Sequence, residues 1–464
     1  MTSSSKKTSS VSVTSGAKRF IRQTMELTDE GLRMTKKALF ISTRIFWPAD
    51  DGRKVVLHHY CKGLHEQLDY DVFVYSFLEG SQSSADALKH PGFIKDVRVA
   101  EPISGFSKAA NLCKLLFNRA MPLQCALFWS DEDARAIRSY CEEVRPDVVI
   151  IDMIRLAPYM AVAKSLDIPV VLDFDDLLSK RYARQIGKEA GNVLGKYGTQ
   201  ASGFMSALAE NRTVKNAVLT VESGRVRRAE DNFARRAEAV LFVSPIESKE
   251  LDERLGTEKC FDATIGAEVL GETIDDAEKE YDLGFVGNLH TAANQAALDY
   301  ICAEILPLLP DKTLRVVGVC PKDVQERYCS LEHVSFSGRV EAIGDELAKC
   351  KVMLAPFAYG TGIKTKILEA MGIGIPVVTN DIGVEGMACR AGIEFELGNT
   401  PEALAKCCET LLLSQVKRRE MASAAKEYIS RNHDWKNSID NLGRCLDFAE
   451  RGRSGNESMS GETR

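Results

Sequence analysis

Short apolar runs alternate with amphipathic stretches along most of this 464-residue chain. Such alternation is typical of a parallel β-sheet covered by helices. It occurs in two blocks, separated by an acidic stretch with few apolar residues at 268–282. The sequence therefore predicts an α/β protein with two Rossmann-like domains in tandem and a ligand cleft between them, at the carboxyl ends of the strands. Strands are expected at 38–42, 71–77, 147–152, 169–174 and 239–244, and then at 283–287, 314–319, 334–337, 352–357 and 376–379.

The domain boundaries follow from the same pattern and from local composition. The first 36 residues are rich in Ser, Thr and Lys and too poor in apolar residues to fold alone, so we expect a disordered basic tail. The expected order is a tail at 1–36, a Rossmann-like domain at 37–267, an acidic linker at 268–282, a second Rossmann-like domain at 283–432, a C-terminal helix at 433–450 and a disordered tail at 451–464.

Composition argues against several classes of protein. The formal net charge of −6 argues against a general nucleic-acid binder, because phosphate contacts need a surplus of Lys and Arg. The 13 cysteines include no CxxC pair, so neither a zinc ribbon nor a dithiol redox site is indicated. No stretch approaches the roughly 18 to 20 apolar residues that span a membrane, and the N-terminus lacks the apolar core of a signal peptide. We therefore expect a cytoplasmic protein.

A glycine-containing turn follows the expected strand at 352–357 and leads into a helix that we expect to start at Ile363. Gly362 allows the backbone to approach a ligand, and the first helical residues offer N–H groups without partners at the positive end of the helix dipole. Such a helix start binds anions, and Lys364 and Lys366 add positive charge there. The turn is therefore expected to bind a diphosphate.

Glu369 lies about two turns into the same helix. Its carboxylate would be close enough to accept hydrogen bonds from two vicinal ribose hydroxyls, each worth on the order of 1.5 to 3 kcal/mol with a charged acceptor. Taken alone, a glutamate at this position also fits a solvated helix face. With the ribose interpretation, one helix would hold both ends of a nucleoside diphosphate.

The residues after Glu369 carry a more specific signal. The chain continues as Ala370-Met371-Gly372-Ile373-Gly374-Ile375-Pro376-Val377-Val378-Thr379. This run resembles the family-4 glycosyltransferases of GT-B fold, in which a loop, a helix with Glu-Ala-Met, a Gly and Pro-Val-Val follow one another. That family usually has two glutamates separated by seven residues; Glu369 matches the second, whereas the first position is Thr361. The form Gly-Thr-Gly-Ile-Lys-x-Lys is similar to a branch common among bacterial exopolysaccharide sugar transferases.

The resemblance implies further donor contacts. Gly287 ends the first expected strand of the second block, and the family's turn after this glycine faces the nucleotide. Arg339 follows the strand that lies beside the base, although a surface arginine is equally natural there. In the first block, Gly52 matches the glycine loop that approaches the donor phosphates from the other domain. Arg53 or Lys54 would complement the diphosphate, or would simply be a charged helix start.

The resemblance also implies the catalytic groups. Lys366 and the helix start would stabilise the leaving diphosphate, while Glu369 would hold the donor. The family's retaining members are thought to let the departing phosphate take the acceptor's proton, so no protein base is assigned. An acceptor contact would project from the strand end at Asp152, and none of the seven histidines lies near it in the sequence. The Asp-rich segment at 173–182 is similar to one in the same branch and is not expected to bind a metal.

Together these residues predict a metal-independent glycosyltransferase that needs no cofactor beyond its nucleoside-diphosphate sugar. It would move a hexosyl group to a saccharide or lipid-linked acceptor, with retention, in polysaccharide or glycolipid biosynthesis. By the same resemblance, residues 37–267 would bind the acceptor and residues 283–432 the nucleotide sugar. Two alternatives stay open: a GT-B-fold sugar-nucleotide epimerase, which would need acid and base groups in the cleft, and a non-catalytic binding protein on a degenerate glycosyltransferase fold.

A peripheral contact with the inner face of a membrane is a further hypothesis. The basic tail at 1–36 could touch anionic lipid or merely be solvated. The segment at 105–128 combines Lys and Arg with apolar residues, which fits either a membrane surface or an amphipathic helix packed on the core.

Overall fold

The computed structural model describes residues 35–49, 52–80, 82–101, 103, 111, 121–186, 212–269, 279–328, 330–340, 342–358 and 362–460, without the side chains of 212, 215 and 453–460. From Lys37 onward these residues belong to one compact unit. The predicted basic tail before residue 35 and the middle of the predicted linker lie outside the described residues. Most of the basic, apolar segment at 105–120 lies outside them as well. No helix in the described part of the chain is both long enough and apolar enough to cross a membrane.

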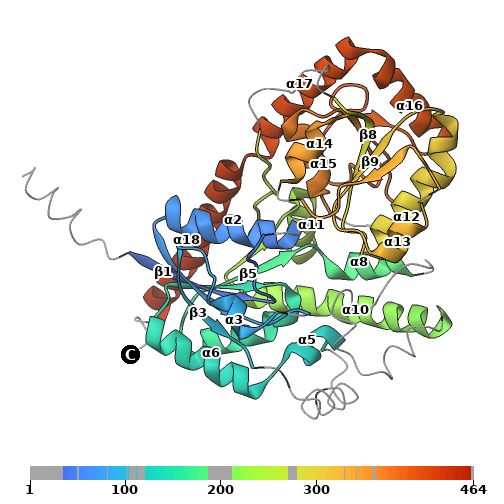
Figure 1. Cartoon of the computed structure of the whole chain (residues 1–464). Coiled ribbons are helices and arrows are strands. Elements are labelled where there is room, and N and C mark those ends of the chain that lie inside the picture. The colour runs from blue at the N-terminus through green and yellow to red at the C-terminus, as the bar shows by residue number, and fades with distance from the viewer. Residues whose placement is uncertain are drawn as a thin grey trace, which may run out of the picture. The chain divides into compact units, whose positions relative to one another are not determined.

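The first half of this unit contains a seven-stranded sheet whose neighbouring strands are all parallel, in the order β3-β2-β1-β4-β5-β6-β7 (Figure 1). Its central strands are continuous runs of Val, Ile and Leu, because helices cover both faces of a parallel sheet. All five residues of β4 are buried. The strands are β1 (Lys36–Ser42), β2 (Tyr70–Ser76), β3 (Ile94–Val99), β4 (Val148–Asp152), β5 (Val170–Asp175), β6 (Ala239–Phe242) and β7 (Cys260–Asp262).

Capping residues define both ends of α6 in this half. The Ser130 hydroxyl accepts hydrogen bonds from the backbone N–H groups of Glu132 and Asp133, and acidic residues fill the first turn. The helix ends at Arg145, which has the left-handed conformation. The helical segments are α2 (Gly52–Glu66), α3 (Ser84–Ala87), α5 (Leu123–Phe128), α6 (Asp131–Val144), the 3-10 helix η1 (Ile154–Tyr159), α7 (Met160–Lys164), α8 (Leu178–Gln185), α10 (Arg212–Arg236) and α11 (Pro245–Leu255).

The second half contains a six-stranded parallel sheet in the order β10-β9-β8-β11-β12-β13. Its strands are β8 (Tyr281–Val286), β9 (Leu314–Val317), β10 (Val334–Phe336), β11 (Cys350–Ala355), β12 (Val377–Thr379) and β13 (Glu396–Leu397). The helical segments are α12 (Ala292–Tyr300), the π-helix η4 (Ile301–Ile305), the 3-10 helix η5 (Leu306–Leu308), α13 (Lys322–Glu326), α14 (Ile343–Ala348), α15 (Thr365–Ile373), α16 (Pro401–Leu413), α17 (Gln415–Asn432) and α18 (Trp435–Ser460). The two parallel sheets confirm the predicted α/β fold class.

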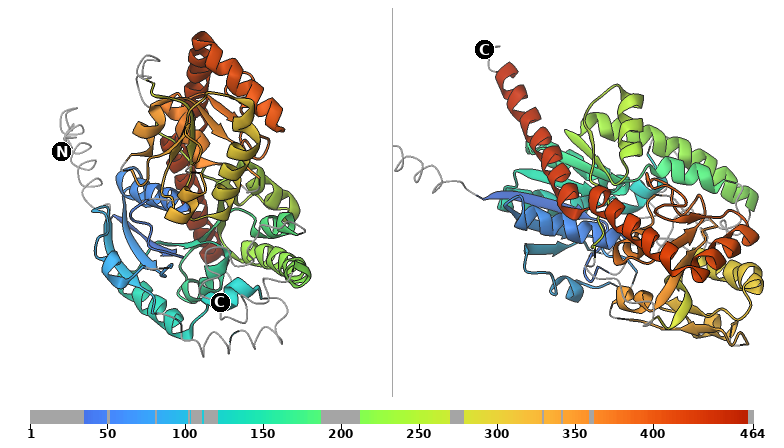
Figure 2. Two further views of the ribbon diagram at one scale, coloured as in Figure 1. Left: turned by 45° about the vertical axis from the view of Figure 1, so that its right-hand side comes forward. Right: turned by 90° about the horizontal axis from the view of Figure 1, so that it is seen from above.

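Near its C-terminal end the chain returns from the C-terminal half to the N-terminal half. Figure 2 shows α18 running back along the N-terminal sheet, where it packs against α2, β6 and β7. Its residues Cys445, Leu446 and Ala449 are buried in the core. The helix continues to Ser460, ten residues beyond the predicted end at 450. The N-terminal sheet therefore receives its last covering helix from the C-terminal end of the chain.

Two strands that the sequence pattern did not predict, β3 and β13, lie at the edges of the sheets; β7, also an edge strand, lies where the pattern indicates only a weak strand after the helix at 245–255. β3 contains Lys95 and Asp96, which are exposed, and it has only one neighbouring strand. β13 has two residues, Glu396 and Leu397, and is likewise an edge strand. Edge strands need no continuous apolar run, because one side of the ladder faces solvent or a loop.

Candidate active site

The helix α15 begins at Thr365, two residues later than predicted, and Lys364 is its N-cap. Ile363, expected to open the helix and to bind the donor, instead places its side chain in the hydrophobic core, where an added Cβ at Gly386 would be 3.2 Å from it. Gly362 has a φ of +70°, a conformation that favours glycine. The preceding residues 359–361, which include the predicted Thr361 position, lie outside the described residues.

The starts of α2 and α15 face each other. A Cβ added to Gly52, the first residue of α2, would lie 3.4 Å from the methyl carbon of Thr365, the first residue of α15. Neither helix has an acidic residue in its first turn, so no carboxylate of these turns neutralises the positive helix ends. Lys54, a predicted phosphate contact, is half-buried in the first turn of α2. Two helix N-termini and nearby lysines form a region suited to an anion.

Lys366 is fixed by two oxygen acceptors. Its Nζ donates to the backbone carbonyl of Val286, at 2.9 Å, and to Oδ1 of Asn294, also at 2.9 Å. Burial lowers the pKa of Lys366 to about 8, while the charge of Glu369 acts in the opposite direction. The ammonium also lies 5.3 Å from the centre of the Phe357 ring. The side chain is therefore held at the carboxyl end of β8.

Lys364 has a different environment. Its Nζ donates to the carbonyl oxygen of Gly362 at 2.5 Å. Burial lowers its pKa to about 8, and the nearby charge of Glu385 opposes that shift. Glu385 also forms an ion pair with Arg184 of α8, which joins the loop after β12 to the N-terminal half. This lysine therefore lies among charges contributed by both halves of the unit.

Glu369 is half-buried, and burial raises its pKa despite the nearby Lys366. Within the described residues, its carboxylate has no hydrogen bond and no ion pair. A desolvated carboxylate without hydrogen-bond donors is unfavourable unless a ligand supplies them. The two vicinal hydroxyls of a ribose would supply both donors.

The loops after β8, β9 and β10 come together at one edge of the C-terminal sheet. Gly287 donates its backbone N–H to Val317 at 3.0 Å. Gly318 has a φ of +127°, and a Cβ there would be 2.4 Å from the Gly287 oxygen, so only glycine fits. Gly318 also pairs with Gly338, which precedes the exposed Arg339. Gly318 was not among the predicted site residues, although a glycine at the end of a strand is a usable signal.

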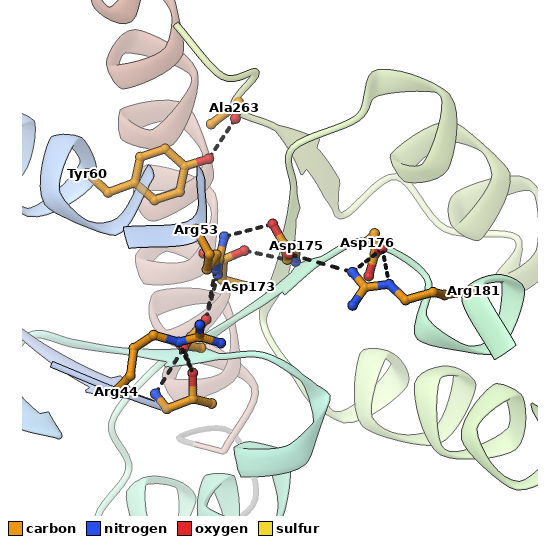
Figure 3. A network of polar contacts seen from close by, with 10 residues as sticks. Arg44, Arg53, Tyr60, Asp173, Asp175, Asp176, Arg181 and Ala263 are labelled. Atoms are coloured by element: carbon orange, nitrogen blue, oxygen red, sulfur yellow. Dashed lines mark hydrogen bonds and ion pairs between the residues drawn. The ribbon is translucent and has the colours of Figure 1, made fainter. Parts of the chain in front are cut away.

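Arg53 does not point toward a phosphate site. It is buried among three carboxylates at the ends of β4 and β5 (Figure 3). Its Nη2 lies 2.6 Å from Asp152 and 2.7 Å from Asp173, and its Nη1 lies 3.1 Å from Asp175. The suggestion that Arg53 complements the diphosphate is therefore wrong in this structure. The side chain instead fixes the first turn of α2 to the N-terminal sheet.

The same network explains Asp152, which was expected to project an acceptor contact into the cleft. Asp152 is fully buried, and its second oxygen accepts hydrogen bonds from the backbone N–H and the hydroxyl of Thr43 at 2.9 and 2.5 Å. Burial opposes its ionisation, but Arg53, Arg44 and Thr43 together lower its pKa. For Asp173, burial outweighs Arg53 and raises the pKa to about 6. The role of Asp152 is therefore to hold Arg53.

Comparison with known proteins gives this site a context. Residues 280–414 match the family model described as glycosyl transferases group 1. A comparison with curated proteins found no match.

Solved structures with a similar fold cover nearly the whole chain. Sucrose-phosphate synthase from Thermosynechococcus elongatus has a TM-score of 0.61 at 13% identity, over 88% of this chain and 98% of that one. HepE from Anabaena, solved with UDP and glucose, has a TM-score of 0.57 at 15% identity, over 89% and 99%. TarM from S. aureus has a TM-score of 0.61 at 11% identity, over 89% and 99%. These similarities show the GT-B fold, and the match of residues 280–414 to a glycosyl transferase domain supports a glycosyltransferase.

Proposed function

We propose that this chain transfers a hexosyl group from a nucleoside-diphosphate sugar to a saccharide or lipid-linked acceptor, with retention of configuration, in polysaccharide or glycolipid biosynthesis. The observation that carries the proposal is the meeting of two helix starts, at Gly52 and Thr365, beside Lys366 and a Glu369 carboxylate that no described residue pairs with. This arrangement supports an anionic ligand that also presents hydroxyl groups.

The donor would lie along α15. Its diphosphate would accept hydrogen bonds from the N–H groups at the helix starts and from Lys364 and Lys366, and its ribose would donate to Glu369. Gly362 and Gly287 would let the backbone approach the ligand. Arg339, exposed on the loop after β10, is proposed as a contact to the base. HepE was solved with UDP and glucose, which supports a uridine nucleotide as the first donor to test.

In the proposed reaction, the group that must be stabilised is the leaving nucleoside diphosphate. As the bond between the sugar and the β-phosphate breaks, negative charge grows on the diphosphate, and Lys366 and the helix starts stabilise it. The acceptor hydroxyl forms the new bond on the same face of the sugar, and its proton passes to the departing phosphate oxygen. In this scheme no protein base and no metal takes part. Both points stay predictions.

A panel of UDP-, GDP- and ADP-sugars tests the proposal by thermal shift, followed by product analysis. A ligand at 100 times its Kd stabilises the folded protein by about 2.7 kcal/mol, which raises the melting temperature. We expect one donor to do so and then to release nucleoside diphosphate when an acceptor is present. No shift with any donor would contradict the donor site. An epimerised sugar nucleotide would instead indicate an epimerase, and binding without turnover would indicate a non-catalytic binding protein.

The location of the protein is a separate proposal. We infer a cytoplasmic protein with a peripheral membrane contact through residues 1–36 or 105–128, segments that lie largely outside the described residues. Co-sedimentation with vesicles that contain anionic lipid would test it, and a protein that stays in the supernatant at low salt would contradict the membrane contact.

A further inference from the structure

We propose that Asn294 is a positioning residue for Lys366: its side-chain amide fixes the ammonium group and ties it to the turn at Gly287. This inference rests on the proposed function, in which Lys366 stabilises the leaving diphosphate. Asn294 itself need not touch the donor.

The contacts of Asn294 connect three segments. Its Oδ1 accepts a hydrogen bond from Lys366 Nζ at 2.9 Å, and its Nδ2 donates to the backbone oxygen of Asn288 at 2.9 Å. A lysine can only donate and a carbonyl can only accept, so the two ends of the amide cannot be exchanged. Asn294 lies in the first turn of α12, Asn288 in the loop after β8 and Lys366 in the first turn of α15. One amide therefore sets the relative position of all three.

Close packing around Asn294 requires a glycine at position 287. A Cβ added to Gly287 would lie 2.9 Å from Cγ of Asn294, closer than real Cβ atoms approach. The amide therefore occupies space that only glycine leaves open. The close packing against Asn294 is therefore sufficient to explain a glycine at position 287, whether or not Gly287 contacts the donor.

The ammonium of Lys366 has three N–H donors. Val286 and Asn294 accept two of them, and the rings of Phe285 and Phe357 lie 5.7 and 5.3 Å away. Among the described residues no acceptor takes the third N–H, which can therefore bind an anion. Without the Asn294 oxygen, the ammonium group of Lys366 would be held by the Val286 carbonyl alone and would populate several orientations. A transition state is stabilised less well by a charge that is not fixed in one position.

The groups that affect the charge of Lys366 are few. Among the described residues, Glu369 raises its pKa and Lys364 lowers it, both from α15. The neighbours from the other elements are the Val286 carbonyl, the Asn294 amide and the Phe285 and Phe357 rings, none of which titrates. A substitution at Asn294 should therefore be visible in the titration of Lys366.

Steady-state kinetics of the full chain with its donor provide the first test. We expect Asn294→Ala to lower kcat about tenfold with a smaller change in donor KM, the effect of losing one hydrogen bond to a charged group in the transition state. In a Lys366→Ala background the same substitution should cause no further loss. Equal losses in both backgrounds would overturn the proposal.

Gln295→Ala is the matched control. Gln295 is the next residue of α12, and its amide also donates to the loop after β8, to the Leu289 oxygen at 2.7 Å, but it does not bond to Lys366. We expect Gln295→Ala to keep kcat within about twofold, although it loosens the same loop. A loss of kcat equal to that of Asn294→Ala would mean that loop stability, and not Lys366, is what Asn294 provides.

A second measurement does not depend on activity. NMR of protein with 13C-labelled lysine side chains follows the ionisation of Lys366. Asn294→Ala removes an acceptor from the charged form and should lower the pKa of Lys366, whereas Asn294→Asp adds a negative charge and should raise it. An unchanged pKa in both variants would overturn the positioning role. If no donor is turned over by the wild type, the proposed function fails, and this titration still decides the role of Asn294.

Discussion

At the residue scale, the charged side chains of α15 share a half-buried environment but differ in their partners. Lys366 is anchored to Val286 and Asn294, and Lys364 is bonded to Gly362. Glu369 has no hydrogen-bond partner among the described residues. Burial lowers the pKa of both lysines to about 8 and raises that of Glu369. In the proposed donor site, the two lysines therefore carry their charge at neutral pH, and the Glu369 carboxylate has hydrogen-bonding capacity for a ligand.

Removing the Glu369 carboxylate should weaken donor binding. We expect Glu369→Ala to raise the donor Kd at least severalfold, because up to two hydrogen bonds to a charged acceptor are lost. Far-UV circular dichroism should show an unchanged fold, since Glu369 holds no other described residue in place. Calorimetric titration measures the affinity. An unchanged Kd would exclude the ribose assignment.

The two lysines predict a pH dependence. Both have a folded-state pKa lowered to about 8, so they are charged below that pH and lose their charge as the pH rises through it. We expect kcat/KM, which reports the free enzyme, to fall above about pH 8. Lys364→Met identifies the group: if Lys366 controls turnover, this variant keeps the decline but moves it to higher pH, because the charge that lowers the pKa of Lys366 is removed. A profile that stays flat up to pH 10 would contradict a catalytic charge on either lysine.

At the element scale, the position of α2 depends on one buried guanidinium. Burial opposes the charge of Arg53, but its three carboxylate partners outweigh burial and raise its pKa. The partners come from the ends of β4 and β5, which places the N-terminus of α2 at the carboxyl edge of the sheet. This anchor fixes the start of α2, and with it Gly52, at the edge of the sheet where Gly52 approaches Thr365 of α15.

Arg53→Met should therefore be strongly destabilising. It leaves buried carboxylates without a counter-charge, a change that costs about 3 to 5 kcal/mol in the free energy of unfolding. The deficit should be smaller at low pH, because Asp173, with a pKa of about 6 beside Arg53, binds its proton at a higher pH in the variant that lacks this counter-charge, and so becomes neutral there first. Urea denaturation at pH 5 and pH 7 checks this. A deficit that is equal at both pH values would contradict the account of the network.

The C-terminal end of α15 approaches the backbone closely. A Cβ at Gly372 would be 2.3 Å from the backbone oxygen of Glu268, so Gly372→Ala should cost about 1 to 3 kcal/mol of folding free energy through overpacking. Gly224→Ala, also inside a helix, meets no atom within 4 Å and should be neutral or stabilising by up to about 1 kcal/mol. Chemical denaturation measures both. Equal effects would show that helix propensity, and not the close approach, decides.

The elements that could be predicted are those with a strong local pattern. Buried parallel strands such as β4 are continuous apolar runs, and α15 combines a Gly-containing start with a buried apolar face. The start of α15 was predicted two residues too early. Ile363 looks like the first apolar residue of the helix, but its side chain lies in the hydrophobic core before the helix begins. The Arg53 network could not be predicted, since Asp152 and Asp173 lie 99 and 120 residues away in the sequence. Such pairings depend on topology, which local patterns do not encode.

At the scale of the whole molecule, two segments connect the two sheets, and they are bonded to each other. The backbone N–H of Ala267 donates to the oxygen of His433 at 2.8 Å, and Nδ1 of His433 lies 2.9 Å from the oxygen of Ile265. A Cβ at Gly266 would be 2.4 Å from Trp435, so the segments also pack tightly. This paired connection leads α18 back to the N-terminal sheet, on which it packs although it follows the C-terminal sheet in the sequence.

The central claim is that a nucleoside-diphosphate sugar binds at the start of α15 and is cleaved there. Chromatographic measurement of nucleoside diphosphate released from the donor selected by thermal shift tests it most directly, with wild type, Lys366→Ala and Gln295→Ala compared in the presence of acceptor. Wild type and Gln295→Ala should both release nucleoside diphosphate. Lys366→Ala should release it at least about a hundredfold more slowly, because one preorganised charge at the leaving group contributes about that factor to the rate. Equal release by all three proteins, or none by wild type, would contradict it.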